Sequence, residues 1–106
     1  MVEWFTATSA EKLGPQQRDV FDIEGYYIAV FNVDGTYYAF EDMCTHDDGP
    51  LAEGVLDGYE IECERHGAKF DIRTGKAVKL PAVTPTRRFE VRIHNGDVQI
   101  AIEPED

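Results

Sequence analysis

Close turns between short apolar runs constrain the fold of this chain more than any other feature of its sequence. Five dipeptides that end in glycine mark these turns: Glu24-Gly25, Asp34-Gly35, Asp57-Gly58, Thr74-Gly75 and Asn95-Gly96. Asp-Gly and Asn-Gly pairs supply the positive φ angles that tight β-hairpin turns require. The sequence therefore predicts a succession of antiparallel hairpins.

The runs beside these turns are rich in β-branched and aromatic residues, which favour strands. The predicted strands lie at residues 26–33, 36–42, 89–94 and 97–102. The run at 89–94 alternates apolar and polar residues, as a strand with one buried face does. One turn of helix is predicted at Ser9–Leu13, with Ser9 as its N-cap. Together these patterns predict an all-β fold, a small antiparallel β-sandwich or barrel.

Three stretches do not fit a strand pattern and are predicted to be irregular: residues 42–54, 63–71 and 79–85. The third contains Pro81 and Pro85, and proline is excluded from the interior of a sheet because it has no N–H to donate. The first two contain both cysteines of the chain and two of its three histidines. Any metal chemistry is therefore expected in these two loops.

Each of these two loops carries one cysteine and one histidine in close spacing. The first contains Cys44 and His46, and the second, after sixteen intervening residues, contains Cys63 and His66. In an extended segment residues i and i+2 point to the same side, about 6.6 Å apart, so Cys44 and His46 can face one inorganic centre. Cys63 and His66 can do the same across a tight turn. Two thiolates and two imidazoles can thus converge on one site.

Three interpretations fit this set of side chains. The first is that the cysteines are simply buried and the histidines have no role, because free cysteine is often a small core residue. The polar character of both loops argues against this interpretation. Structural zinc is another, since two cysteines and two histidines are a common tetrahedral set, but such modules usually keep like ligands in like halves. A [2Fe–2S] cluster with two histidines on one iron is the third. The mixed halves favour the cluster, because each loop can send its cysteine to one iron and its histidine to the other.

The two loops resemble the cluster-binding boxes of the Rieske family. The resemblance is carried by CTHDDGPLAEG (44–54), by CERHGAKFDIRTGKA (63–77) and by the proline loop near Pro81. It extends over nearly the whole chain, and is strongest to the small Rieske-type ferredoxins of bacterial aromatic-ring-hydroxylating dioxygenase systems. It implies a Rieske-like β fold with a cluster-binding subdomain of two loops, and one Rieske-type [2Fe–2S] cluster.

The resemblance also implies a role for each ligand. Cys44 and Cys63 would bind one iron, while His46 and His66 would bind the other, which would lie nearer the surface. Neutral imidazoles donate less charge than thiolates, so the histidine-bound iron is expected to be the one reduced.

Residues around the ligands are expected to shape and tune the site. Gly49 and Gly67 would let backbone amides approach the sulfides. An apolar rim would shield the cluster, and it comprises Pro50, Leu51 and Pro81. The sequence assigns no role to Asp47 or Arg65.

The reduction potential is expected to be low. High-potential Rieske proteins have a serine and a tyrosine whose hydroxyls hydrogen-bond cluster sulfur, and a disulfide between the loops. Ala68 and Phe70 stand at those two positions here, and the chain has only two cysteines. The more negative reduced cluster therefore lacks these donors, which predicts a potential on the order of −150 mV.

Length and charge limit the architecture and the partners. The chain of 106 residues suits one domain, 1–106, with a cluster-binding part at about 42–85. A net charge of −11 argues against nucleic acid and against an anionic membrane surface. The N-terminus lacks the pattern of a signal peptide and no stretch could span a membrane. We expect a cytoplasmic monomer.

One-electron transport, rather than catalysis, is the function that these observations and the resemblance imply. A chain this small has little room for a substrate pocket beside a cluster. Electrons would pass from an NAD(P)H-dependent flavin reductase, through this protein, to a terminal oxygenase of aromatic hydrocarbon catabolism. Two alternatives stay open at this point. One is a housekeeping Rieske ferredoxin or a small electron-transfer subunit of another oxidoreductase, and the other is a zinc-bound interaction module.

Overall fold

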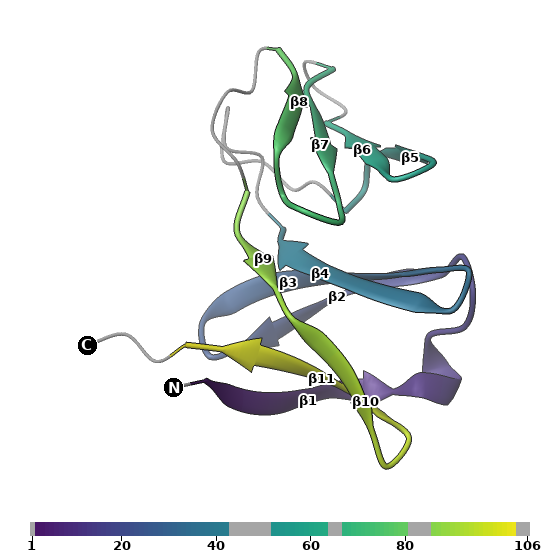
Figure 1. The fold of residues 1–106 in the computed structure, drawn as a ribbon, viewed down its shortest axis with the longest axis vertical. Helices are drawn as coiled ribbons and strands as arrows, with labels where there is room; N and C mark the ends of the chain where they lie inside the picture. Colours follow the sequence, from purple (N-terminus) through teal and green to yellow (C-terminus); the bar gives the residue numbers. More distant parts are fainter. Residues whose placement is uncertain (1, 43–51, 64–66, 81–85, 104–106) are drawn as a thin grey trace.

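The computed structural model describes residues 2–42, 52–63, 67–80 and 86–103 (Figure 1). Its strands are β1 (Glu3–Ser9), β2 (Arg18–Ile23), β3 (Tyr26–Val33), β4 (Thr36–Glu41), β5 (Val55–Asp57), β6 (Glu60–Glu62), β7 (Lys69–Asp71), β8 (Ala77–Lys79), β9 (Arg88–Phe89), β10 (Val91–His94) and β11 (Asp97–Ile102). The only helix within the described ranges is a 3-10 turn at Ala10–Lys12. The expected all-β class is confirmed.

The strands form three antiparallel sheets. One has the order β1-β11-β10 and another β2-β3-β4-β9, and together we call these two sheets the base. The third has the order β5-β6-β7-β8, and we call it the upper sheet because it stands above the base in Figure 1. The upper sheet is inserted in the chain between β4 and β9.

The structure confirms three of the hairpin turns that the glycine dipeptides predicted. Glu24-Gly25 joins β2 to β3, Asp34-Gly35 joins β3 to β4, and Asn95-Gly96 joins β10 to β11. Both residues of each pair have φ between 51° and 92°. Consecutive positive φ angles produce the twist that matches right-handed β-strands, which is why these turns fix the hairpins.

Strand β3 is buried on both faces and joins the two parts of the molecule. Ile28 and Val30 lie in a core shared by the two sheets of the base. The intervening Ala29 and Phe31 lie in a second core, between the base and the upper sheet. Burial on both faces explains why this run is continuously apolar instead of alternating.

The strand predicted at 89–94 is divided between two sheets. Arg88–Phe89 pairs with β4, whereas Val91–His94 pairs with β11. The prediction of one continuous strand was therefore wrong, because the chain crosses between the sheets of the base at Glu90. The alternation of apolar and polar residues reports burial, but it does not report which neighbour a strand pairs with.

Other sequence-based boundaries also need correction. Lys69–Asp71, expected to be irregular, forms β7, which pairs with β6 on one side and with β8 on the other. Lys79 ends β8, an edge strand of the upper sheet, instead of beginning a loop. Ser9 ends β1 and occupies the predicted N-cap position of the short helix, but its side chain makes no capping hydrogen bond. Strands of two or three residues are too short to show a period, and neighbouring strands decide their conformation.

An ion pair in the upper sheet predicts a dependence of stability on pH. Arg73 donates from Nε to Asp71 Oδ1 at 3.1 Å and from Nη2 to Oδ2 at 3.0 Å. These bonds lower the pKa of Asp71 below its ordinary value of 3.8. A lowered carboxyl pKa stabilises the fold above the unfolded-state pKa, and that stabilisation is lost as the pH falls through the folded-state pKa.

We therefore expect a pH-dependent difference in free energy of unfolding between the native protein and Asp71→Asn. It should be constant from about pH 7 to about pH 5 and shrink below about pH 4. Denaturant unfolding across this range measures it. A difference that stays constant down to acid pH would show that the ion pair does not act through the Asp71 charge.

Candidate metal centre

Cys63 is the predicted ligand whose surroundings the structure describes. It directly follows β6, and its side chain is 1% exposed and forms no disulfide. It packs in the core between the base and the upper sheet, together with Ala68 and Phe70. Cys44, His46 and His66 lie outside the described residues, as do Gly49, Pro50, Leu51 and Pro81.

Backbone hydrogen bonds close the second ligand loop around Cys63. Cys63 N–H donates to the carbonyl of Ala68 at 2.7 Å, and Gly67 N–H donates to the carbonyl of Cys63 at 3.0 Å. Gly67 has a φ of 73°, and a Cβ there would meet Glu62 Oε1 at 3.4 Å. The Gly67 N–H thus closes the turn, and the expectation that Gly67 lets backbone amides approach the sulfides stays a prediction. Glycine is needed here for its left-handed conformation.

The first ligand loop is closed by a side chain. Asp42 Oδ1 accepts a hydrogen bond from the backbone N–H of Ala52 at 2.7 Å. Ala52 is buried and belongs to the same packed core as Cys63 and Ala68. The described ends of the two ligand loops therefore meet in one core, as a shared metal centre requires.

Thr86, directly after residues 81–85, contacts both the upper sheet and the base. Thr86 N–H donates to the carbonyl of Gly75 at 2.8 Å, and Thr86 Oγ1 donates to the carbonyl of Glu41 at 3.1 Å. The first bond holds the β7–β8 hairpin, and the second holds the end of β4. Thr86 thus ties the upper sheet to the base immediately after residues 81–85.

Sequence reasoning missed the residues that close these loops, which are Asp42, Gly75 and Thr86. Gly75 was identified only as a turn residue. The Asp42–Ala52 bond spans ten positions and the Thr86–Glu41 bond spans 45. Contacts over such separations have no local pattern, so only the folded chain reveals them.

The surroundings of Cys63, the proposed ligand within the described residues, fit a buried inorganic cluster. The Cys63 thiol lies in an apolar core beside Ala68 and Phe70, which are 0% and 1% exposed and carry no hydroxyl. Elsewhere in the described ranges, no three His, Cys, Asp or Glu side chains come together as a metal site. His94, the third histidine, is exposed on β10 of the base, outside the two ligand loops.

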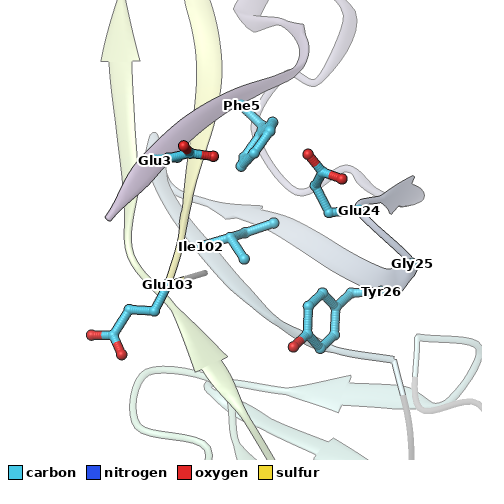
Figure 2. A pocket seen from close by; sticks show the side chains of 7 residues that line it. All are labelled: Glu3, Phe5, Glu24, Gly25, Tyr26, Ile102 and Glu103. Carbon is cyan, nitrogen blue, oxygen red and sulfur yellow. The ribbon is translucent and has the colours of Figure 1, made fainter. Parts of the chain in front are cut away.

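A hollow in the base is separate from this centre. It has a volume of about 510 Å³, and its lining includes Glu3, Phe5, Glu24, Tyr26 and Glu103 (Figure 2). None of its lining residues belongs to the ligand loops. It therefore does not adjoin Cys63.

Comparison with known proteins decides between the interpretations of the ligand set. Residues 3–90 match the family described as the Rieske [2Fe-2S] domain. The chain belongs to this family. Its cofactor is accordingly a Rieske-type [2Fe–2S] cluster, and the zinc interpretation is set aside.

Relatives of similar length are ferredoxins of dioxygenase systems. The ferredoxin component of biphenyl 2,3-dioxygenase from Rhodococcus jostii RHA1 is 41% identical over 95 residues, which are 90% of this chain and 89% of the relative. The ferredoxin of carbazole 1,9a-dioxygenase from Nocardioides aromaticivorans IC177 has a TM-score of 0.88 at 29% identity, covering 94% of this chain and 98% of that one. These relatives are electron carriers, which confirms that the protein is not itself the catalytic component. They also confirm the Rieske-like fold.

A second solved structure matches in a complex. Its title describes reduced oxygenase and oxidised ferredoxin of carbazole 1,9a-dioxygenase, and the matching chain is 36% identical with a TM-score of 0.86. The match covers 92% of each chain.

Among the described residues of this protein, no helix is long and apolar enough to cross a membrane.

The buried positions of Ala68 and Phe70 predict how the potential can be raised. Ala68→Ser and Phe70→Tyr would each place a hydroxyl in the core beside Cys63. A net hydrogen bond of ~1 kcal/mol to the more negative reduced state corresponds to about 40 mV for a one-electron couple. We expect each substitution to raise the potential by about this amount in a redox titration.

The chain offers matched controls for this measurement. Ala39 and Phe89 are also buried, but they lie in the core of the base. Ala39→Ser and Phe89→Tyr should leave the potential unchanged. A potential that does not rise in Ala68→Ser and Phe70→Tyr would contradict the account of tuning by absent hydroxyls.

Proposed function

We propose that this protein carries single electrons from a flavin-containing reductase to a terminal oxygenase that acts on aromatic compounds. The observation that carries the proposal is the match over about nine-tenths of both chains to the ferredoxin component of a biphenyl dioxygenase. The solved complex of an oxygenase with a similar ferredoxin supports the acceptor side. The reductase is inferred from the need for an electron donor.

We assign Cys44, His46, Cys63 and His66 as the ligands of the cluster. When bound, the cluster supplies a centre that gains and loses one electron. Cys44 and Cys63 would hold one iron as thiolates, and His46 and His66 would hold the other through neutral imidazoles. The loop closures at Asp42 and Cys63 support this assignment, because they bring the described ends of both loops into one core.

The core around Cys63 is suited to a low potential. Ala68 and Phe70 exclude water from the thiol side and offer no hydroxyl to the cluster sulfur. An apolar environment without donors stabilises the reduced state less than a polar one does. We therefore propose a potential near the low end of the Rieske range, on the order of −150 mV.

Charge supports transient recognition of the partners. The chain has 21 acidic and 10 basic residues, so its surface favours partners with basic contact regions. Reduction by the cognate reductase should slow as ionic strength rises, because salt screens long-range steering. Stopped-flow reduction at several salt concentrations measures this. A rate independent of salt would contradict electrostatic steering.

Reconstitution tests the proposed position in the electron chain. Purified protein is combined with NADH, a ferredoxin reductase and the terminal oxygenase of a biphenyl-type system, and formation of the hydroxylated product is measured. Product is expected only when all components are present. Reduction of the protein without product formation in any such oxygenase system would favour the housekeeping ferredoxin instead.

Three further expectations stay predictions. We propose that the chain acts as a monomer, that it works in the cytoplasm, and that residues 1–106 are one domain with the cluster held by the part at about 42–85. Its described part has its two cores joined through β3, which supports a single cooperative unit.

A further inference from the structure

Asp42 bonds to Ala52 across the two ends of the first ligand loop, and we call this pair of residues the neck of the loop. Its Oδ1 accepts a hydrogen bond from Ala52 N–H at 2.7 Å, across the segment 43–51 that contains Cys44 and His46. Ala52 is 7% exposed and packs in the core that contains Cys63. The carboxylate thus fixes the outgoing end of one ligand loop beside the ligand of the other.

The base in turn holds Asp42. Its backbone N–H donates to the carbonyl of Tyr27 on β3 at 2.7 Å, and the N–H of Glu41 donates to the carbonyl of Arg87, also at 2.7 Å. Thr86 Oγ1 donates to the carbonyl of Glu41 at 3.1 Å. The backbone at 41–42 is hydrogen-bonded to two neighbouring segments. These bonds fix the position of the Asp42 carboxylate relative to Ala52.

We propose that Asp42 is a positioning residue for the cluster. By holding Ala52 N–H it fixes the end of the segment that carries two proposed ligands against the core that contains Cys63. The inference rests on the ligand assignment proposed above.

Two physical arguments support this role. Closing a loop costs chain entropy. If the neck is closed before the cluster binds, less entropy is lost when the ligands bind the cluster. A carboxylate is also a stronger acceptor for a backbone N–H than a neutral group.

Two substitutions in the cluster-loaded protein separate the hydrogen bond from the charge. Asp42→Asn removes the negative charge but keeps Oδ1 as an acceptor, whereas Asp42→Ala removes both. Loss of visible cluster absorption in excess chelator gives the release rate, and EPR linewidth after reduction reports the spread of cluster geometries. Asp42→Ala is expected to release the cluster about ten-fold faster than the native protein and to broaden the EPR signal, since a hydrogen bond to a charged group is lost. Asp42→Asn keeps a weaker, neutral acceptor and should therefore release the cluster at an intermediate rate, about three-fold faster than the native protein.

Asp19 supplies a matched control. Its Oδ1 accepts a hydrogen bond from the adjacent Val20 N–H at 2.8 Å, so it bonds a backbone amide but closes no loop. Asp19→Ala should therefore release the cluster at the native rate with a native EPR linewidth.

Each other outcome overturns the proposal. If Asp42→Ala releases the cluster at the native rate, the neck does not position the ligands. If Asp42→Asn releases it as fast as Asp42→Ala, charge and not the acceptor bond is responsible. Should Asp42→Ala fail to fold, hydrogen exchange at the Ala52 amide of the native protein decides: slow exchange supports the bond, and exchange at the rate of an exposed amide refutes it. Failure of the ligand assignment would show separately, because His66→Ala would then keep the cluster whatever Asp42 does.

Discussion

Replacing Cys63 or His66 with alanine is expected to abolish the cluster, whereas replacing His94 leaves it intact. Each of the first two changes removes one of four proposed ligands, and an iron with an open position in a protein loop is readily lost. Cys63 is also buried in the core that contains Ala52 and Ala68, so no solvent-exposed group can substitute for its thiol. Iron and sulfide content, together with visible absorption, measure the loss.

The histidine pair makes this test specific. His66→Ala and His94→Ala are the same chemical change, but His94 is exposed on β10 of the base, outside the ligand loops. Circular dichroism of the variants would show that the strands persist without the cluster. Full cluster content in His66→Ala, or its loss in His94→Ala, would contradict the ligand assignment.

Gly75→Ala is expected to be the most destabilising single methyl addition in the described part of the chain. Gly75 has a φ of +80°, and a Cβ there would lie 2.4 Å from the backbone oxygen of Thr86. The left-handed conformation costs a non-glycine residue about 1–2 kcal/mol, and forcing extra volume into a packed contact costs about 1–3 kcal/mol more. The free energy of unfolding should therefore fall by roughly 2–5 kcal/mol in a denaturant titration.

Gly58→Ala provides the control for backbone strain alone. Gly58 has a φ of +63°, but a Cβ there would meet nothing within 4 Å. It should lose only about 1–2 kcal/mol. Equal losses at the two positions would mean that the Gly75–Thr86 contact is not tight, and that the upper sheet is tied to the base in some other way.

Local chemistry explains which parts of the fold could be predicted from sequence. Asn95-Gly96 and Asp34-Gly35 favour positive φ angles, so the dipeptides alone predict their turns. Strand β3 is long enough for its apolar composition to indicate a strand. The Cys44–His46 and Cys63–His66 pairs are likewise local patterns, and their mixed composition favoured an iron–sulfur cluster.

What could not be predicted depends on contacts distant in sequence. Lys69–Asp71 became a strand because β6 pairs with it, and the chain changes sheets at Glu90 because β4 and β11 compete for the same run. Asp42 has no neighbour in sequence that indicates its bond to Ala52. Spacing thus predicts the ligands, whereas the contacts between Asp42 and Ala52 and between Thr86 and Glu41 required the fold.

The core around Cys63 couples the potential of the protein to its stability. Cys63, Ala68 and Phe70 belong to the same packed core as Phe31 and Ala29 of β3. The proposed ligand is therefore packed against β3, whose other face lies in the core of the base. Substitutions in this core should change the potential and the stability together, whereas those in the core of the base should change stability alone.

Anaerobic reduction of the purified protein, followed by EPR and redox titration, tests the central claim most directly. The claim is that the chain is a low-potential one-electron carrier with two histidines on one iron. It predicts a red-brown protein that takes up one electron, gives the low average g value typical of a Rieske centre, and has a midpoint on the order of −150 mV. A clearly positive midpoint would contradict the proposed tuning, and a colourless protein containing stoichiometric zinc would contradict the claim itself.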